Sequence, residues 1–123
     1  MTPIDAQALA DRYAAVWNDS NPKTRRDTIE TLWSPDGEHY VGVREVRGHE
    51  QLQERVTGAY EKNVRDAKHL FRAVKNAQHV HGVVTFNWEM IEPANGEVLA
   101  TGLEFLQLDA QGRIKVDHQF IVG

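Results

Sequence analysis

The chain has 123 residues, the length of one ordinary domain, and we expect residues 1–123 to fold as a single unit. Hydrophobic residues make up 41% and charged residues 26%, values that are typical of a globular protein and exclude a disordered or fibrous one. The formal net charge is -4, with acids and bases interspersed, so no nucleic-acid partner is expected. The absence of cysteine excludes disulfides, thiolate metal sites and a cysteine nucleophile.

The amino-terminal residues carry no sign of a targeting segment. Met1 to Asp5 includes neither a basic stretch nor an apolar one, as a secretory signal would. No apolar run approaches the roughly 18 residues that a membrane helix needs. We therefore expect a cytoplasmic protein without a membrane partner.

The first half of the chain is predicted to form three helices and one strand. The first two helices each begin with a capping residue followed by proline, at Thr2-Pro3 and at Asn21-Pro22. Asp36-Gly37 predicts a turn, and Gly42 a bulge or bend in the strand that follows. The expected ranges are 2–18, 21–34 and 48–63 for the helices and 38–46 for the strand.

The second half changes character and is predicted to form four strands. They cover residues 70–77, 80–92, 97–108 and 113–122. Asn95-Gly96 and Gln111-Gly112 have the chemistry of short hairpin connections, which make neighbouring strands antiparallel. The sequence therefore predicts an α+β fold in which helices pack on one face of a curved antiparallel sheet.

Several short segments follow one another in a characteristic order along nearly the whole chain. They are Arg12-Tyr13 with Val16-Trp17, Leu32 to Gly37, Val46 to Gly48, Phe86 to Met90, and Gly102 to Phe105 with Asp109 to Ile114. In order and spacing they resemble the nuclear transport factor 2-like superfamily, which includes ketosteroid isomerase and the SnoaL-like polyketide cyclases. The resemblance implies a cone, with three N-terminal helices on a curved, mostly antiparallel sheet that encloses a pocket. The superfamily contains enzymes and pure binding proteins, so fold alone leaves both functions open.

Alignment with ketosteroid isomerase, together with the period of two along a strand, assigns side chains to the two faces of the sheet. The inward set is Phe86, Trp88, Met90, Glu104, Leu106, Lys115, Asp117, Gln119 and Ile121. The outward set on the last strand is Ile114, Val116, His118 and Phe120. This outer set is apolar enough to predict a homodimer interface, an arrangement that the resemblance also implies.

Glu104 is the strongest candidate for chemistry. It lies in an apolar strand, where an ionised carboxylate is unfavourable unless it is hydrogen-bonded or protonated. The resemblance places it where ketosteroid isomerase has a protonated aspartic acid that stabilises the substrate oxyanion. Tyr13 matches the tyrosine that is the second oxyanion donor of that enzyme. The alternatives are an acid paired with a basic side chain and a tyrosine that only packs in the core.

The general base of the isomerase has no counterpart in this sequence. Its position falls at about Val41, or at Tyr40, and neither side chain shuttles protons near neutral pH. This departure argues against a steroid isomerase proper. His39 lies on the same strand face as Val41 and could replace the base. Asp117 is a second candidate, unless it orients His39 or pairs with Lys115.

The pocket implied by the resemblance would have an aromatic wall suited to a flat, mostly apolar ligand. We expect its ligand contacts to come from Trp17, Val41, Phe71, Phe86, Trp88, Met90 and Gln119. His79 and His81 have no identifiable third ligand, so no metal site is expected. No phosphate-binding or dinucleotide-binding glycine motif occurs, so no cofactor is expected.

Two functions follow as hypotheses. The first is a small-molecule-binding protein of the SnoaL-like kind that acts as a cofactor-free isomerase or cyclase on an apolar carbonyl or polycyclic compound. In it His39 or Asp117 would be the base, and Glu104 and Tyr13 would stabilise enolate charge. The second is a non-catalytic ligand-binding or dimerisation module with the same fold. An epoxide hydrolase is disfavoured, because no arginine is evident for an Asp–Arg–Asp set.

Overall fold

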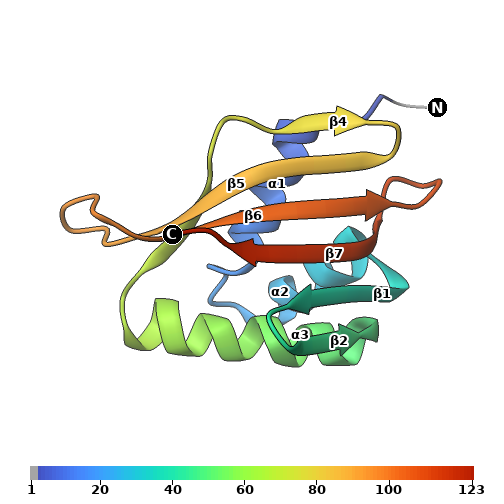
Figure 1. The fold of residues 1–123 in the computed structure, drawn as a ribbon. Helices are drawn as coiled ribbons and strands as arrows, with labels where there is room; N and C mark the ends of the chain where they lie inside the picture. The colour runs from blue at the N-terminus through green and yellow to red at the C-terminus, as the bar shows by residue number, and fades with distance from the viewer. Residues whose placement is uncertain (1–2) are drawn as a thin grey trace.

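A computed structural model describes residues 3–123 (Figure 1). The helical elements are α1 (Ala6–Val16), α2 (Pro22–Leu32), α3 (Gly48–Ala59) and the π-helical segment η1 (Tyr60–Asp66). The strands are β1 (Trp33–Val41), β2 (Arg44–Arg47), β3 (Leu70–Ala73), β4 (Gln78–Val80), β5 (Val83–Ile91), β6 (Val98–Leu108) and β7 (Ile114–Ile121). The predicted α+β class is confirmed.

The strands form one curved sheet in the order β2-β1-β7-β6-β5-β3, and β4 pairs with β5. Pairs joined by short connections are antiparallel, as predicted, whereas β1 and β7 run parallel because most of the chain separates them. The helix α1 packs against β3 and β5, and α3 packs against β1 and β2 at the other end of the sheet (Figure 1). This arrangement is the predicted cone, with the core between the helices and the sheet.

The start of α1 differs from the prediction, and the start of α2 agrees with it. The carboxylate of Asp5 accepts a hydrogen bond from the Ala8 amide at 3.0 Å, so α1 begins after Asp5 and Pro3 precedes it. Thr2 lies outside the described residues. In α2 the Asn21 side chain caps the first turn and Pro22 occupies the first helical position.

The turn predicted at Asp36-Gly37 is wrong, and the strand predicted over 38–46 is two strands. Pairing with β7 keeps residues 33–41 extended, and the irregularity is absorbed as a bulge between Trp33 and Glu38. The chain turns instead at Gly42, whose φ of 57° is in the left-handed region that tight hairpins require.

Three other predicted elements also differ in extent from those in the structure. The strand predicted over 80–92 is interrupted at His81-Gly82, where φ values of 43° and 80° make a two-residue hairpin between β4 and β5. The third helix continues beyond Ala59 as η1, and the strand predicted over 70–77 is limited to β3. Sequence periodicity carries little information about these differences, because they depend on strand pairing and on helix geometry.

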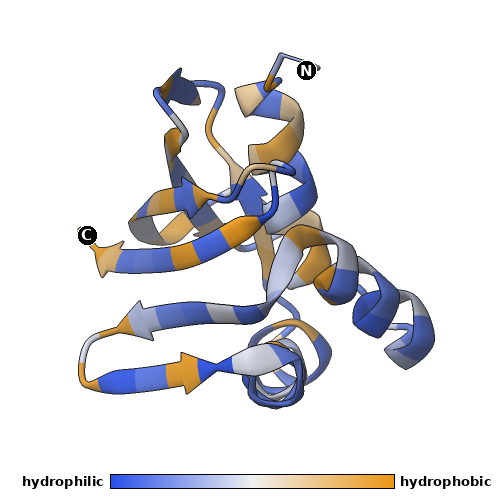
Figure 2. Ribbon diagram, turned by 90° about the vertical axis from the view of Figure 1, so that its right-hand side faces the viewer, coloured by the Kyte–Doolittle hydropathy of each residue, from blue (hydrophilic) through white to orange (hydrophobic). Residues whose placement is uncertain are grey.

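A bulge in β7 changes the predicted assignment of its faces. Leu108 pairs with Ile114 and Gln107 with Val116, so Lys115 is the extra residue in this strand. Ile114 is therefore buried in the core instead of lying on the outer face, and Lys115 is exposed instead of pointing inward. Beyond the bulge the predicted faces hold, because Asp117 is buried and Gln119 lines the cavity, whereas Phe120 is exposed. Figure 2 shows a hydrophilic stretch in the middle of the strand that leads to the C-terminus, followed by a hydrophobic end.

Candidate active site

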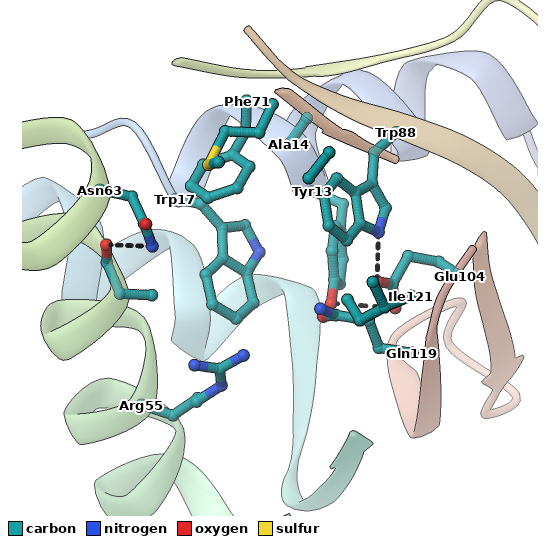
Figure 3. A pocket seen from close by; sticks show the side chains of 13 residues that line it. Tyr13, Ala14, Trp17, Arg55, Asn63, Phe71, Trp88, Glu104, Gln119 and Ile121 are labelled. Carbon is teal, nitrogen blue, oxygen red and sulfur yellow. Dashed lines mark hydrogen bonds between the residues drawn. The ribbon is translucent and has the colours of Figure 1, made fainter. Parts of the chain in front are cut away.

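A cavity of about 190 Å³ lies between the helices and the concave face of the sheet (Figure 3). Most of its wall is apolar and aromatic, with Trp17 from α1, Phe71 from β3, and Trp88 and Met90 from β5. These side chains and Gln119 were predicted to contact ligand, and all five line the cavity.

The other two predicted ligand contacts lie away from the cavity wall. Phe86 is buried beneath Tyr13, with ring centroids 5.6 Å apart in an edge-to-face arrangement, and serves as core packing. Val41 is the last residue of β1, next to the hairpin turn, and is not among the lining residues. Both assignments relied on strand alternation, which identifies the face of a residue but not its depth along the cone.

A buried hydrogen-bond network connects four of the polar candidates. The Tyr13 hydroxyl oxygen lies 2.6 Å from Asp117 Oδ2 and 3.2 Å from Glu104 Oε2. The Trp88 indole N–H donates to Glu104 Oε1 at 2.9 Å, and His39 Nδ1 lies 2.8 Å from Asp117 Oδ2. The structure thus brings together the four side chains predicted to carry chemistry, although Glu104 and Tyr13 line the cavity and His39 and Asp117 lie behind them.

Strand register explains why residues far apart in sequence meet here. His39 on β1 is directly opposite Asp117 on β7, and Glu104 on β6 is paired with Gln119 on the same β7 strand. Gly102 contributes by lacking a side chain, since a methyl group there would collide with the indole of Trp88. The indole can therefore lie across β6 and reach Glu104.

Glu104 is the neutral member of the network. Its side chain is completely buried, and this burial, followed by the charge of Asp117, raises the pKa of Glu104 well above its ordinary value. The Tyr13 hydroxyl has a single hydrogen, and the shorter contact assigns that hydrogen to Asp117. The hydrogen in the contact between Tyr13 and Glu104 then belongs to the carboxyl group, in agreement with its raised pKa.

Asp117 is the charged member. Burial alone would raise its pKa, but the charge of His39 and the hydrogen bonds from His39 and Tyr13 outweigh burial and lower the pKa of Asp117. Burial, followed by the charge of Asp117, raises the pKa of Tyr13 well above its usual range, so the phenol keeps its proton. The network holds one buried carboxylate, one buried carboxylic acid and a hydroxyl between them.

Arg55 of α3 is a functional candidate that the sequence analysis missed. Its Nε donates to His39 Nε2 at 3.5 Å, and its guanidinium carbon lies 5.1 Å from the centre of the Trp17 ring. The spacing of apolar residues identified the buried face of α3, but it gave no signal for a polar residue beside that face.

Neither a metal-binding cluster nor a membrane-spanning helix is found in the part of the chain that the structure describes. Within residues 3–123, no group of three or more histidine, aspartate or glutamate side chains is placed to hold a metal ion. The helices of this part of the chain are also too short or too polar to cross a membrane.

Three helices on a curved, unclosed sheet around an apolar cavity define the nuclear transport factor 2-like fold, to which the SnoaL-like proteins belong. A SnoaL-like family protein from Agrobacterium tumefaciens, provisionally named an isomerase, matches with a TM-score of 0.86 and 21% identity over 96% of this chain and 97% of that one. A nuclear transport factor 2-like protein of unknown function from an Exiguobacterium species matches at 0.71 and 18%, over 93% and 98% of the two chains.

A third match is a Sinorhizobium meliloti protein provisionally named a polyketide cyclase, with a TM-score of 0.69 and 10% identity over 97% of this chain and 99% of that one. No family model matches the sequence, and no curated protein matches it significantly. The resemblance predicted from the sequence is confirmed at the level of the fold.

Proposed function

We propose that this protein binds a small, largely apolar carbonyl compound in the cavity and catalyses a cofactor-free proton transfer on it, as an isomerase or a cyclase does. The observation that carries the proposal is a completely buried carboxyl group with a raised pKa, Glu104, at the wall of an apolar cavity. Through Tyr13 it is connected to a buried carboxylate–imidazole pair. Acid–base catalysis is expected where two acidic groups lie close together and their surroundings give them different pKa values, so that one is neutral and the other ionised.

In this mechanism Glu104 provides the acid. Its proton, which in the free protein is directed at Tyr13, is offered to the carbonyl oxygen of the ligand and stabilises the enol or enolate that forms. The hydrogen bond from Trp88 holds the carboxyl group in place, with one oxygen accepting and the other free to donate. The apolar wall excludes water, which strengthens this hydrogen bond.

The base is the Asp117–His39 pair, which acts through Tyr13. As a proton leaves the carbon next to the carbonyl group, it passes to the Tyr13 hydroxyl oxygen, and Tyr13 passes its own proton to Asp117 Oδ2. The 2.6 Å contact between the two oxygens is short enough for this transfer, and no tyrosinate has to accumulate. Return of the proton to a different carbon would complete an isomerisation.

Exchange of carbon-bound hydrogen in D2O tests the proposal without knowledge of the natural substrate. Acetophenone and cyclohexanone are suitable probes, and proton NMR would follow loss of the signal next to the carbonyl group. We expect the protein to accelerate exchange and Glu104→Gln to reduce the rate by at least about a hundredfold. Glu97→Gln, at an exposed glutamate, is the matched control and should leave the rate unchanged.

The second candidate is a binding module without catalysis. The observation in its favour is that His39 is completely buried and has both ring nitrogens engaged, by Asp117 and by Arg55. If NMR shows that the ketones bind while their exchange rates stay at the level of buffer, catalysis is refuted and the binding module is the better description.

We also propose that two copies of the chain associate through the outer face of the sheet. Val116, His118 and Phe120 lie on this face, and Phe105 of the neighbouring strand packs against His118 with ring centroids 6.4 Å apart. Phe120 is 51% exposed, which is unusual for a large aromatic side chain on a sheet. Ile114, which the sequence analysis included, belongs to the core and is not part of this face.

A further inference from the structure

Arg55 differs from several other arginines of the chain in lacking an acidic partner. Arg47, Arg65 and Arg72 each have a carboxylate oxygen within 4.0 Å, and all three are on the surface. Arg55 is half-buried at the cavity wall, and no carboxylate of residues 3–123 lies within that distance of it. Its Nε donates to His39, and its two terminal nitrogens have no hydrogen-bond partner among the described residues. A guanidinium in such a place has unused capacity to bind an anion in two parallel hydrogen bonds.

A second, independent observation comes from Trp17. Its side chain is only 6% exposed, and its buried indole nitrogen has no hydrogen-bond partner among the described residues. The ring lines the cavity, and Figure 3 shows the nitrogen on the side that faces Tyr13. Buried N–H groups without a partner are rare in folded proteins, because the lost hydrogen bond with water is not replaced. An acceptor atom from a ligand would replace it.

The other polar groups of the cavity also fit an anion. Gln119 lines the cavity, and no hydrogen bond occupies its side-chain amide within the described residues. Among residues 3–123, Glu104 has the only carboxyl group that lines the cavity, and its oxygens contact Trp88 and Tyr13. The cavity therefore offers donors on the Arg55 side and no free carboxylate for a cationic ligand.

The dimensions of the cavity limit the apolar part of the ligand. A volume of about 190 Å³ is close to that of protein cavities that hold a single benzene ring, which have about 150 Å³. The part of a ligand that lies inside the cavity is therefore about the size of one ring or a short branched chain. Phe71 and Trp88 lie on the side of the cavity away from Arg55 (Figure 3), and Met90 also lines the cavity.

We propose that the ligand of this cavity is a small monocarboxylate with a carbonyl group, an oxo acid, whose carboxylate binds Arg55 and the Trp17 indole N–H while its one-ring-sized body packs against Phe71 and Trp88. This inference deepens the proposed function and rests on it for the carbonyl group, which Glu104 and Tyr13 would receive. The carboxylate site itself requires only that the cavity bind a ligand.

A pair of probes that differ in charge but not in shape tests the carboxylate site. Benzoate and benzamide would each be titrated into the protein by calorimetry at low ionic strength. We expect benzoate to bind at least tenfold more tightly than benzamide. Arg55→Gln should weaken benzoate binding at least tenfold, leave benzamide binding within twofold, and thereby remove the preference. Arg26→Gln, at an exposed arginine of α2, makes the same charge change outside the cavity and should alter neither.

Two further variants distinguish the anion site from a purely structural role of Arg55. Trp17→Phe removes the indole N–H and should also weaken benzoate more than benzamide, and Arg55→Lys should restore part of the preference. Circular dichroism would confirm that each variant is folded. Equal binding of the two probes, equal weakening of both by Arg55→Gln, or no binding of benzoate at millimolar concentration would overturn the carboxylate site.

The outcome is separable from the test of catalysis. If benzoate binds more tightly than benzamide in a manner that depends on Arg55, but no hydrogen exchange on ketones occurs, the carboxylate site is supported and the catalytic proposal is refuted. If hydrogen exchange depends on Glu104 but benzoate binds no more tightly than benzamide, the catalytic proposal is supported and the carboxylate site is refuted.

Discussion

Glu104 shows how one residue acquires its chemistry from its surroundings. A glutamate in water is ionised at neutral pH, but this one is completely buried, faces the charge of Asp117, and receives a hydrogen bond from Trp88. Burial and the nearby charge both favour the neutral acid, and the network gives its hydrogen an acceptor in Tyr13. An acid that is kept neutral in this way affects stability as well as catalysis.

The first prediction concerns the pH dependence of stability. Because the pKa of Glu104 is raised in the folded protein, the folded state binds more protons than the unfolded chain, so the free energy of unfolding falls as pH rises above about 4.5. Glu104→Gln removes this loss and mimics the neutral acid. We expect the variant to gain stability relative to the wild type between pH 5 and pH 8, by at most about 1.4 kcal/mol per pH unit.

Urea unfolding at several pH values would measure the gain. The range begins at pH 5 because Asp117, whose pKa is lowered, loses its stabilising charge only at more acidic pH. Glu97→Gln should show no such trend. A difference between Glu104→Gln and the wild type that is the same at pH 5 and pH 8 would mean that Glu104 ionises normally.

The second prediction concerns the hydroxyl that links the two acids. Tyr13→Phe keeps the ring, which packs against Trp33 and Phe86, but leaves Asp117 and Glu104 without their shared partner. We expect a loss of about 1–3 kcal/mol in the free energy of unfolding, because a buried charge loses a hydrogen bond. Chemical denaturation would measure it. Tyr60→Phe, at a half-buried tyrosine whose hydroxyl has no protein partner among the described residues, should change little.

At the scale of elements, bulges and glycines place the site residues. The bulge at Lys115 changes the phase of β7, so that both Ile114 and Asp117 point to the inside of the cone. Gly102 on β6 leaves the space that the Trp88 indole occupies. The hairpin turn at Gly42 ends β1 just beyond His39, whose partner Asp117 lies on the adjacent parallel strand.

The third prediction tests the space at Gly102. In Gly102→Ala the added methyl group would collide with the Trp88 indole, which would have to rotate away and lose its hydrogen bond to Glu104. We expect destabilisation of about 1–3 kcal/mol, as for other overpacked sites, together with a change in tryptophan fluorescence. Gly58→Ala is the matched control.

Gly58 lies on the exposed side of α3, and a methyl group there meets no atom within 4 Å. This substitution should therefore stabilise the protein by about 0.5–1 kcal/mol, since alanine favours helix more than glycine does. If Gly102→Ala and Gly58→Ala changed the free energy of unfolding in the same direction, the packing of Trp88 against Gly102 would not explain why position 102 requires glycine.

At the scale of the whole molecule, the sheet separates two surfaces with different chemistry. Its concave face lines the cavity, and its convex face carries an aromatic group in which His118 lies between Tyr40 and Phe105. Phe120 continues this face toward the C-terminus. The proposed dimer would cover the convex face and leave the concave one free for ligand.

The fourth prediction tests this dimer. Sedimentation velocity should give the mass of two chains for the wild type and of one chain for Phe120→Glu, because a buried carboxylate on each side of the interface is strongly unfavourable. Gln111→Glu, in the exposed loop before β7, adds the same charge elsewhere and should remain dimeric. A wild type that sediments as a single chain at all concentrations would contradict the proposal.

The α+β class, the division of the chain into a mainly helical first half and a strand-rich second half, and the main polar candidates could all be predicted from the sequence, because they depend on local patterns. Caps such as Asn21-Pro22, the period of apolar residues and a lone acid such as Glu104 in an apolar strand are visible within a few residues. The resemblance to the nuclear transport factor 2-like superfamily came from the order of such segments.

Which side chains meet could not be predicted, because it depends on how the elements pack. The bulge that sends Ile114 into the core depends on pairing with β6, and Arg55 becomes a cavity residue because α3 packs against β1, which carries His39. The protonation of Glu104 depends on burial and on Asp117, which lies on a different strand. These are interactions between residues distant in sequence, and their strength is set by separation and burial in space, which no local pattern records.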